Sequence, residues 1–148
     1  MTTRPKSLLY KTSLRWVEGV EGVLSSPGKP DISVSSPPEF KGPEGNWTPE
    51  NLFTASVELC LMLTYLSFCR SRNVALASYT SSAVGTLEPV AGEQVMSKVT
   101  VLPKIVVKSQ EHLAMAKEIA GFVHEKCFIS NSIESEVKVE AEITVAAS

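Results

Sequence analysis

The first third of the chain alternates apolar and polar residues in short runs that turn-forming residues separate. Residues 8–16 have the pattern of a strand, and Gly19 and a Ser-Ser-Pro-Gly turn at 25–28 interrupt the segment after it. Residues 31–35 alternate with period two and predict a third short strand. Residues 36–47 are rich in proline and glycine, and such a long loop inside one domain is more often functional than a linker.

A long apolar segment comes after this loop and predicts a helix over residues 49–71. Thr48 is a good N-cap, and Pro49 suits the first helical position. The segment is apolar on nearly every side of the helix. A helix with no wet face must be enclosed, and one sheet covers only one side of it. We therefore expect a partner chain to cover another side, in an obligate homodimer.

The rest of the chain predicts two strands, a second helix and a last strand. The two strands are expected to be antiparallel around the Pro-Val-Ala-Gly turn at 89–92, and Ser109 is expected to cap the helix. These elements are expected at 74–87, 93–108, 109–126 and 137–145. The order βββ-α-ββ-α-β is that of an α+β protein, with one domain over residues 1–148.

Composition narrows the possible functions. The 148 residues suffice for the core of one domain, and 43% hydrophobic and 20% charged residues are ordinary for a soluble globular protein. A formal charge of −2 without a basic stripe gives no electrostatic support for a nucleic-acid partner. No apolar stretch of signal-peptide length follows the N-terminus, and polar residues interrupt the longest apolar run. We expect a cytoplasmic protein with reduced cysteines.

The three cysteines offer the most specific chemistry. Cys60 lies inside the predicted long helix, and Cys127 lies between the second helix and the last strand. Cys69 follows Cys60 by nine positions, which at about 3.6 residues per turn places it on the opposite helical face. We therefore interpret Cys69 as a core residue. Cys60 and Cys127 also suit a buried core, and slow reaction of both with a thiol reagent would favour that alternative.

Other candidate groups lie near these cysteines in the sequence. Glu50 is in the first turn of the long helix, where the dipole favours an acid, about 15 Å along the helix from Cys60. Glu50 shares a pocket with the Cys60 thiol only if the loop at 36–47 folds back over the helix or if a second chain supplies its own Glu50. His124 precedes Cys127 by about one turn, but it suits interaction with the helix dipole better. The sequence has no zinc-ligand spacing, phosphate loop or dinucleotide motif.

Two segments resemble the signature motifs of the OsmC/Ohr family, the osmotically inducible and organic hydroperoxide resistance proteins. Residues 45–60, GNWTPENLFTASVELC, are similar to the family pattern Pro-Glu-x-Leu-x-Ala-Ala-x-x-x-Cys. Residues 127–133, CFISNSI, are similar to its second motif, Cys-Pro-hydrophobic-Ser. The order of elements also agrees, so the resemblance covers nearly the whole chain. It implies an intertwined homodimer with the long cysteine helix at its centre.

The resemblance implies thiol-dependent reduction of organic hydroperoxides, without metal or organic prosthetic group. Cys60 would attack the peroxide as a thiolate and become a sulfenic acid, and Cys127 would then condense with it to a disulfide. A dithiol such as a lipoyl group, or a small thiol, would regenerate both cysteines. Glu50 would be an orienting acid.

In the family an arginine pairs with that acid and stabilises the thiolate. Its expected positions hold Val20 or Glu39 in this chain. Arg15 is the nearest candidate cation, ahead of Lys41, because lysine lacks the bidentate guanidinium. Phe128 also stands where the family usually has proline.

This departure leaves an alternative function open. The protein would keep the fold without the catalysis, as a stress protein that binds a small apolar ligand at the dimer interface. The residues expected near that ligand are Phe40, Phe53 and Met62.

Overall fold

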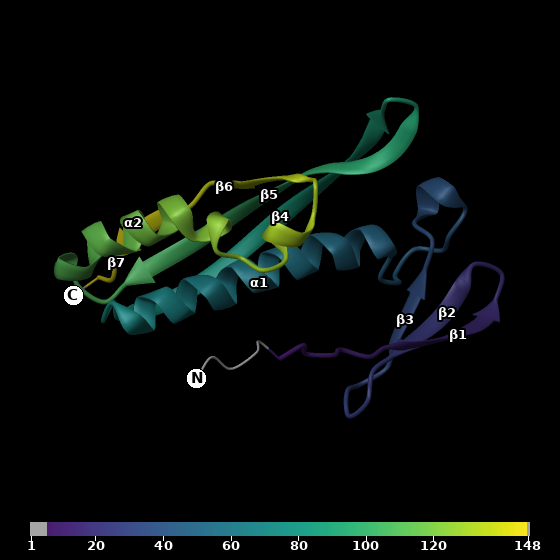
Figure 1. The fold of residues 1–148 in the computed structure, drawn as a ribbon, viewed down its shortest axis with the longest axis horizontal. Helices are drawn as coiled ribbons and strands as arrows, with labels where there is room; N and C mark the ends of the chain where they lie inside the picture. Colours follow the sequence, from purple (N-terminus) through teal and green to yellow (C-terminus); the bar gives the residue numbers. More distant parts are fainter. Residues whose placement is uncertain (1–5, 148) are drawn as a thin grey trace. The chain divides into compact units, whose positions relative to one another are not determined.

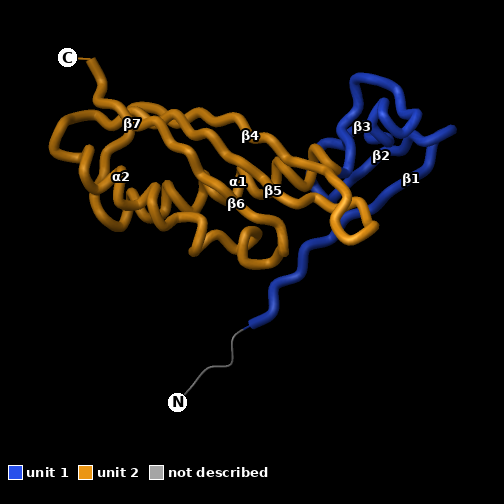
Figure 2. The backbone as a smooth tube through the Cα atoms, turned by 90° about the horizontal axis from the view of Figure 1, so that it is seen from above, with its two compact units in different colours: residues 1–49 blue, residues 50–148 orange. Residues whose placement is uncertain are grey.

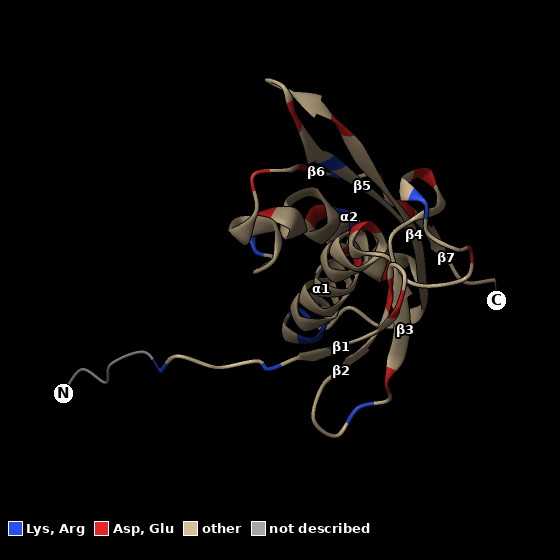
Figure 3. Ribbon diagram, turned by 90° about the vertical axis from the view of Figure 1, so that its right-hand side faces the viewer, with Lys and Arg blue, Asp and Glu red and all other residues tan. Residues whose placement is uncertain are grey.

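The computed structural model describes residues 6–147. The chain divides into two compact units, residues 1–49 and residues 50–148 (Figure 2). The first contains a three-stranded sheet, and the second contains two helices and a four-stranded sheet (Figure 1). Acidic and basic residues are interspersed along the elements (Figure 3). The mixed α+β class and the predicted order of the main elements are confirmed.

The sheet of the first unit is antiparallel, in the order β1 (Ser13–Glu18), β2 (Glu21–Ser25), β3 (Ile32–Ser35). Gly19 makes the turn between β1 and β2 at φ 52°, a left-handed conformation that favours glycine. The first strand begins later than the predicted 8–16. Ser13 pairs with Ser25, which is the last residue of β2. The described residues before Ser13 therefore have no residue of β2 opposite them.

The proline- and glycine-rich loop contains one short 3-10 helix, η1 (Pro38–Phe40). The loop then returns to β3, where the Ser35 N–H donates to the Trp47 carbonyl at 3.0 Å and Trp47 pairs with Val34. The loop is therefore tied to the first sheet at the point where it leads into the long helix.

The long helix α1 (Pro49–Ser71) has the predicted bounds. Its buried stripe consists of Val57, Leu61, Tyr65 and Cys69. Leu59 and Leu63, on other sides, are 55% and 54% exposed in the single chain. By length and composition α1 could cross a membrane, but the core helix of a soluble protein has the same properties.

The strands β4 (Leu76–Val90) and β5 (Glu93–Val107) form a long antiparallel hairpin. Its turn is tighter than the predicted 89–92, because Pro89 and Val90 still pair within β4. The chain reverses at Ala91 and Gly92, whose φ values are 52° and 87°. Two positive φ angles characterise the type I′ turn, whose twist matches that of the strands.

The second helical segment consists of η2 (Gln110–His112), α2 (Leu113–Phe122) and η3 (Val123–Glu125). Ser109 does not cap it with its side chain; the Ser109 Oγ donates to Glu111 Oε1 at 3.2 Å instead. The helices α1 and α2 both cover one face of the second sheet (Figures 1 and 3). Their buried residues form one core with alternate residues of β5.

The last predicted strand is divided into β6 (Glu136–Val139) and β7 (Glu142–Val145), both parallel to β5. The register is unchanged across the break. The Val101 carbonyl of β5 accepts a hydrogen bond from the Glu140 N–H at 2.9 Å, but Pro103, two residues later on the same edge, has no N–H to donate. The proline therefore explains the interruption of the ladder.

Candidate active site

α1 directs its two cysteines to opposite faces. Cys69 is 3% exposed, lies in the core and shares a hydrogen bond with Tyr65, and its burial raises the pKa of its thiol. Cys60 is partly exposed and faces the segment after the second helix. The prediction that Cys69 is a core residue, away from Cys60, is confirmed.

Residues 127–132 form a single helical turn beside Cys60. The carbonyls of its first three residues accept hydrogen bonds of 2.7 to 3.0 Å from Asn131 and Ser132. Backbone N–H groups in a helical turn point opposite to its carbonyls. The N–H groups of Phe128 and Ile129 accordingly point away from the end of the turn, and both contribute to lowering the pKa of the Cys60 thiol.

The surroundings of Cys60 favour its ionised form. Burial raises the pKa of the Cys60 thiol, but the hydrogen bonds to the sulfur outweigh burial and lower the pKa below its ordinary value. In order of size, the groups that lower the pKa are the Ile129 N–H, the Cys127 thiol, the Thr64 hydroxyl and the Phe128 N–H. The single proton of the Thr64 hydroxyl is donated to the Cys60 carbonyl at 2.8 Å. All four groups are uncharged, so dipoles stabilise the Cys60 thiolate.

Cys127 is fully buried and favours its protonated form. Burial raises the pKa of the Cys127 thiol, the hydroxyl and N–H of Ser130 oppose this effect, and the neighbouring Cys60 raises the pKa further. The Ser130 Oγ is itself buried without a hydrogen-bond partner among the described residues, close enough to the Cys127 sulfur to affect its pKa. The pKa of Cys60 is thus lowered and that of Cys127 is raised, and the Cys127 thiol can donate its proton to the Cys60 sulfur.

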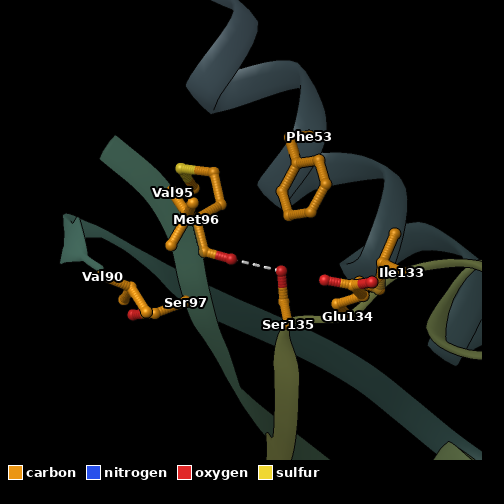
Figure 4. A pocket seen from close by; sticks show the side chains of 8 residues that line it. All are labelled: Phe53, Val90, Val95, Met96, Ser97, Ile133, Glu134 and Ser135. Atoms are coloured by element: carbon orange, nitrogen blue, oxygen red, sulfur yellow. Dashed lines mark hydrogen bonds between the residues drawn. The ribbon is translucent and has the colours of Figure 1, made fainter. Parts of the chain in front are cut away.

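A cavity of about 640 Å³ lies beside α1 and the tip of the β4–β5 hairpin (Figure 4). Its lining residues are Phe53, Val90, Val95, Met96, Ser97, Ile133, Glu134 and Ser135. Phe53 projects from α1 toward Met96 and Ser135, and the Ser135 Oγ donates to the Met96 carbonyl (Figure 4). Phe53 precedes Cys60 by seven residues, about two turns, so both occupy one face of α1. Of the residues expected near a ligand, Phe53 lines this cavity, whereas Phe40 and Met62 do not.

The other two sequence candidates lie elsewhere in the chain. Glu50 is in the first turn of α1, and its Oε1 is buried without a hydrogen-bond partner among the described residues. The helical rise separates Glu50 from Cys60 by about 15 Å, so the acid does not touch this thiol within one chain. Arg15 is exposed on β1, opposite Val23, in the first unit.

His124, considered as a base for Cys127, belongs to η3, and the groups that act on Cys127 are Ser130 and Cys60. Over residues 6–147, no three His, Cys, Asp or Glu side chains are grouped so that they could hold a metal ion. The structure brings together the two thiols Cys60 and Cys127.

Sequence reasoning missed several groups at this site. Thr64 follows Cys60 by four residues, and Ser130 follows Cys127 by three. Residues at these spacings are neighbours on a helical turn, so the sequence alone could have indicated that each hydroxyl lies near a thiol. The N–H groups of Phe128 and Ile129 have no such signal, because every residue except proline has one. They become visible only once the turn is folded.

Comparison with known proteins gives consistent matches. The family model described as OsmC-like protein matches residues 42–142. YmaD, an uncharacterized protein of Bacillus subtilis, is 22% identical over 116 residues, which cover 76% of this chain and 77% of YmaD.

Solved structures share the fold. An OsmC-like protein of unknown function from Vibrio cholerae has a TM-score of 0.84 and 27% identity, covering 92% of this chain and 100% of that one. An organic hydroperoxide resistance protein from Elizabethkingia anophelis has a TM-score of 0.71 and 19% identity, covering 98% of this chain and 100% of that one.

Proposed function

The chain belongs to the OsmC-like protein family, and from this membership we propose that it reduces organic hydroperoxides with Cys60 and Cys127. The observation that carries the proposal is the contact between these two thiols, which have opposite shifts of pKa. Structural neighbours that are named organic hydroperoxide resistance proteins support the choice of substrate class.

The two cysteines have different roles in this proposal. Cys60 is the attacking thiol, because it is partly exposed and its lowered pKa increases the share of thiolate, the nucleophilic form. Cys127 is the resolving thiol, because it is fully buried, keeps its proton and lies against Cys60. A resolving thiol at contact distance stops the oxidation at its reversible stage.

The reaction then has three steps. The Cys60 thiolate attacks the terminal oxygen of the hydroperoxide, the O–O bond breaks, and the leaving alkoxide takes a proton to become the alcohol. The resulting Cys60 sulfenic acid reacts with the Cys127 thiol, which forms the disulfide and releases water. An external dithiol, such as a lipoyl group, or two small thiols then reduce the disulfide and are themselves oxidised.

The cavity beside Phe53 is suited to the organic part of the substrate. Its walls are mainly apolar, and it lies on the face of α1 that holds Cys60. Burial of a hydrocarbon tail there would stabilise the complex by about 0.8 kcal/mol for each methylene group. The proposal therefore favours hydroperoxides with an alkyl or aryl group over hydrogen peroxide.

We further propose a cytoplasmic homodimer. Leu59 and Leu63 are more than half exposed on α1 in the single chain, and a second copy would bury them. Glu50 is proposed as the orienting acid and Arg15 as the candidate cation of the dimer. Sedimentation velocity should give about twice the chain mass of 16.0 kDa, and a monomer at micromolar concentration would contradict the dimer.

The test is a peptide map of the reduced protein after one equivalent of an organic hydroperoxide. We expect rapid formation of a linked peptide that joins Cys60 to Cys127. Cys60→Ser should abolish peroxide consumption, whereas Cys69→Ala, the matched control in the core, should retain it. Free thiols at both positions after prolonged exposure would overturn the proposed reaction.

A second candidate is a non-catalytic protein that binds a small apolar ligand. The observation in its favour is the apolar cavity, whose lining includes neither cysteine. Native mass spectrometry of the purified protein would then detect a bound lipid-like molecule together with thiols that do not respond to peroxide. A ligand-free protein that forms the disulfide would exclude this candidate.

A further inference from the structure

The cavity beside Phe53 has one charged side chain in its wall. Of the eight described residues that line it, Glu134 alone carries a formal charge (Figure 4). Glu134 is exposed to solvent, so its carboxylate is ionised at neutral pH. It forms no ion pair within residues 6–147. An uncompensated negative charge therefore adjoins a space whose walls are otherwise mainly apolar.

A hydrogen bond fixes the position of Glu134 against the β4–β5 hairpin. Ser135, the next residue, donates from its Oγ to the Met96 carbonyl of β5 (Figure 4). The Ser97 hydroxyl, which also belongs to the wall, donates to Glu88 Oε1 at 2.6 Å. A second carboxylate thus lies one hydrogen bond away from the cavity and adds to the negative potential there.

A bulge in β5 keeps the nearest lysine away from this wall. Ser97 is an extra residue between Met96 and Lys98, which pair with successive residues of β4. Residues two apart in a strand share a face, but the extra residue allows Met96 to line the cavity while Lys98 lies on the other face of the sheet. Lys98 directly precedes the fully buried Val99 and pairs with Glu136 of β6. The lining of the cavity accordingly contains no basic side chain.

We propose that the Glu134 carboxylate makes this cavity select the organic group of the hydroperoxide by its charge. This inference rests on the proposed function, in which the cavity holds that group. An uncharged group is accepted because its methylenes are buried against apolar walls. A second carboxylate is opposed because like charges repel and both would lose water. Hydroperoxides with uncharged organic groups are therefore the preferred substrate class, and fatty-acid hydroperoxides are poor substrates.

The experiment measures binding of three unreactive probes that share one chain length: octanol, octanoate and octylammonium. The reduced protein carries ¹³C-labelled methionine methyl groups for NMR, because Met96 lines the cavity whereas Met62 and Met115 do not and serve as internal controls. We expect octanol and octylammonium to move the Met96 resonance. Octanoate should bind about tenfold more weakly than octanol, the order of size for two like charges near a protein surface.

Glu134→Gln removes the charge and keeps the size of the side chain. In this variant octanoate should bind about tenfold more tightly than before, and octylammonium should bind more weakly. Glu136→Gln is the matched control, because it removes the same charge two residues away, outside the cavity lining, and should leave all three affinities unchanged. Octanoate that binds as well as octanol to the unchanged protein, or that does not respond to Glu134→Gln, would overturn the inference.

The result can be separated from the outcome for the proposed reaction, since no probe contains a peroxide. A Met96 resonance that none of the three probes moves would overturn the inference, because the cavity would then hold no organic group. Binding as expected in a protein that forms no Cys60–Cys127 disulfide would support the charge selection and refute the proposed reaction.

Discussion

Two tyrosines with buried hydroxyl groups provide a sharp test of the core that supports the thiol site. The Tyr65 hydroxyl of α1 donates to the Ala116 carbonyl of α2 at 3.0 Å and thereby joins the two helices. The Tyr79 hydroxyl of β4 is buried without a hydrogen-bond partner among the described residues. The two ring centroids are 5.8 Å apart. Changing either tyrosine to phenylalanine removes the same atom from the same region, once from a hydrogen bond and once from an unpaired position.

The expected free energies of unfolding differ in sign or size. Tyr65→Phe should lower stability by about 1 kcal/mol, the net value of a neutral hydrogen bond. Tyr79→Phe should leave stability unchanged or raise it by about 1 kcal/mol, because an unpaired buried hydroxyl costs roughly 1–3 kcal/mol. In a protein of this size, a loss of 1 kcal/mol lowers the melting temperature by about 3 °C.

The assay is urea unfolding of the reduced protein, with all variants at the same concentration because an oligomer would make the midpoint depend on it. A shift of the midpoint at constant slope reports stability alone. Equal losses in the two variants would refute the reasoning, since they would mean that the Tyr79 hydroxyl is as well paired as that of Tyr65.

Three further predictions concern the stability of the second unit. Burial raises the pKa of the Tyr65 hydroxyl, and it raises the pKa of the Tyr79 hydroxyl to about 12. Above pH 10 the unfolded chain therefore loses these protons first, so the free energy of unfolding should fall as pH rises, and it should fall less steeply in Tyr65→Phe. A free energy of unfolding that stays constant between pH 10 and 12 would contradict this prediction. Gly85→Ala should cost about 1–3 kcal/mol in urea unfolding, because its Cβ would meet Thr54 Oγ1 and lie 2.7 Å from Met96 Cε. Gly121→Ala, on α2 with nothing within 4 Å of its Cβ, should instead stabilise by up to about 1 kcal/mol, and a loss there would contradict the packing described.

The fold is predictable from the sequence wherever the pattern of apolar residues is long. The helix at 49–71 was predictable to the residue, because a proline fixes its start and apolar residues continue to its end. One error lies where a single residue overrides a pattern. The amphipathic run 137–145 alternates as one strand should, yet Pro103, a residue of another strand, interrupts its pairing. No local pattern within 137–145 contains that information.

The candidate site was predictable only in part, for a related reason. The motifs indicated Cys60 and Cys127, and the structure places them against each other. Helical geometry also separated Cys69 correctly, because the period of a helix relates residues on one element. Ser130 and Thr64 each contact a thiol, but serine and threonine are too common for their spacing alone to have identified them.

The absence of an arginine at its expected positions weighed against activity in the sequence, since a thiolate needs a compensating positive group. That inference counted side chains alone. Two backbone N–H groups of the turn that bears Cys127 lower the pKa of the Cys60 thiol, and backbone N–H groups are partial positive charges held in fixed directions. A site of this kind depends on the position of the turn and on whether residue 128 has a backbone N–H. A substitution of Phe128 by proline would therefore change the electrostatic environment of the Cys60 thiol without changing any formal charge. A missing basic residue is therefore insufficient evidence that the Cys60 thiol is inert.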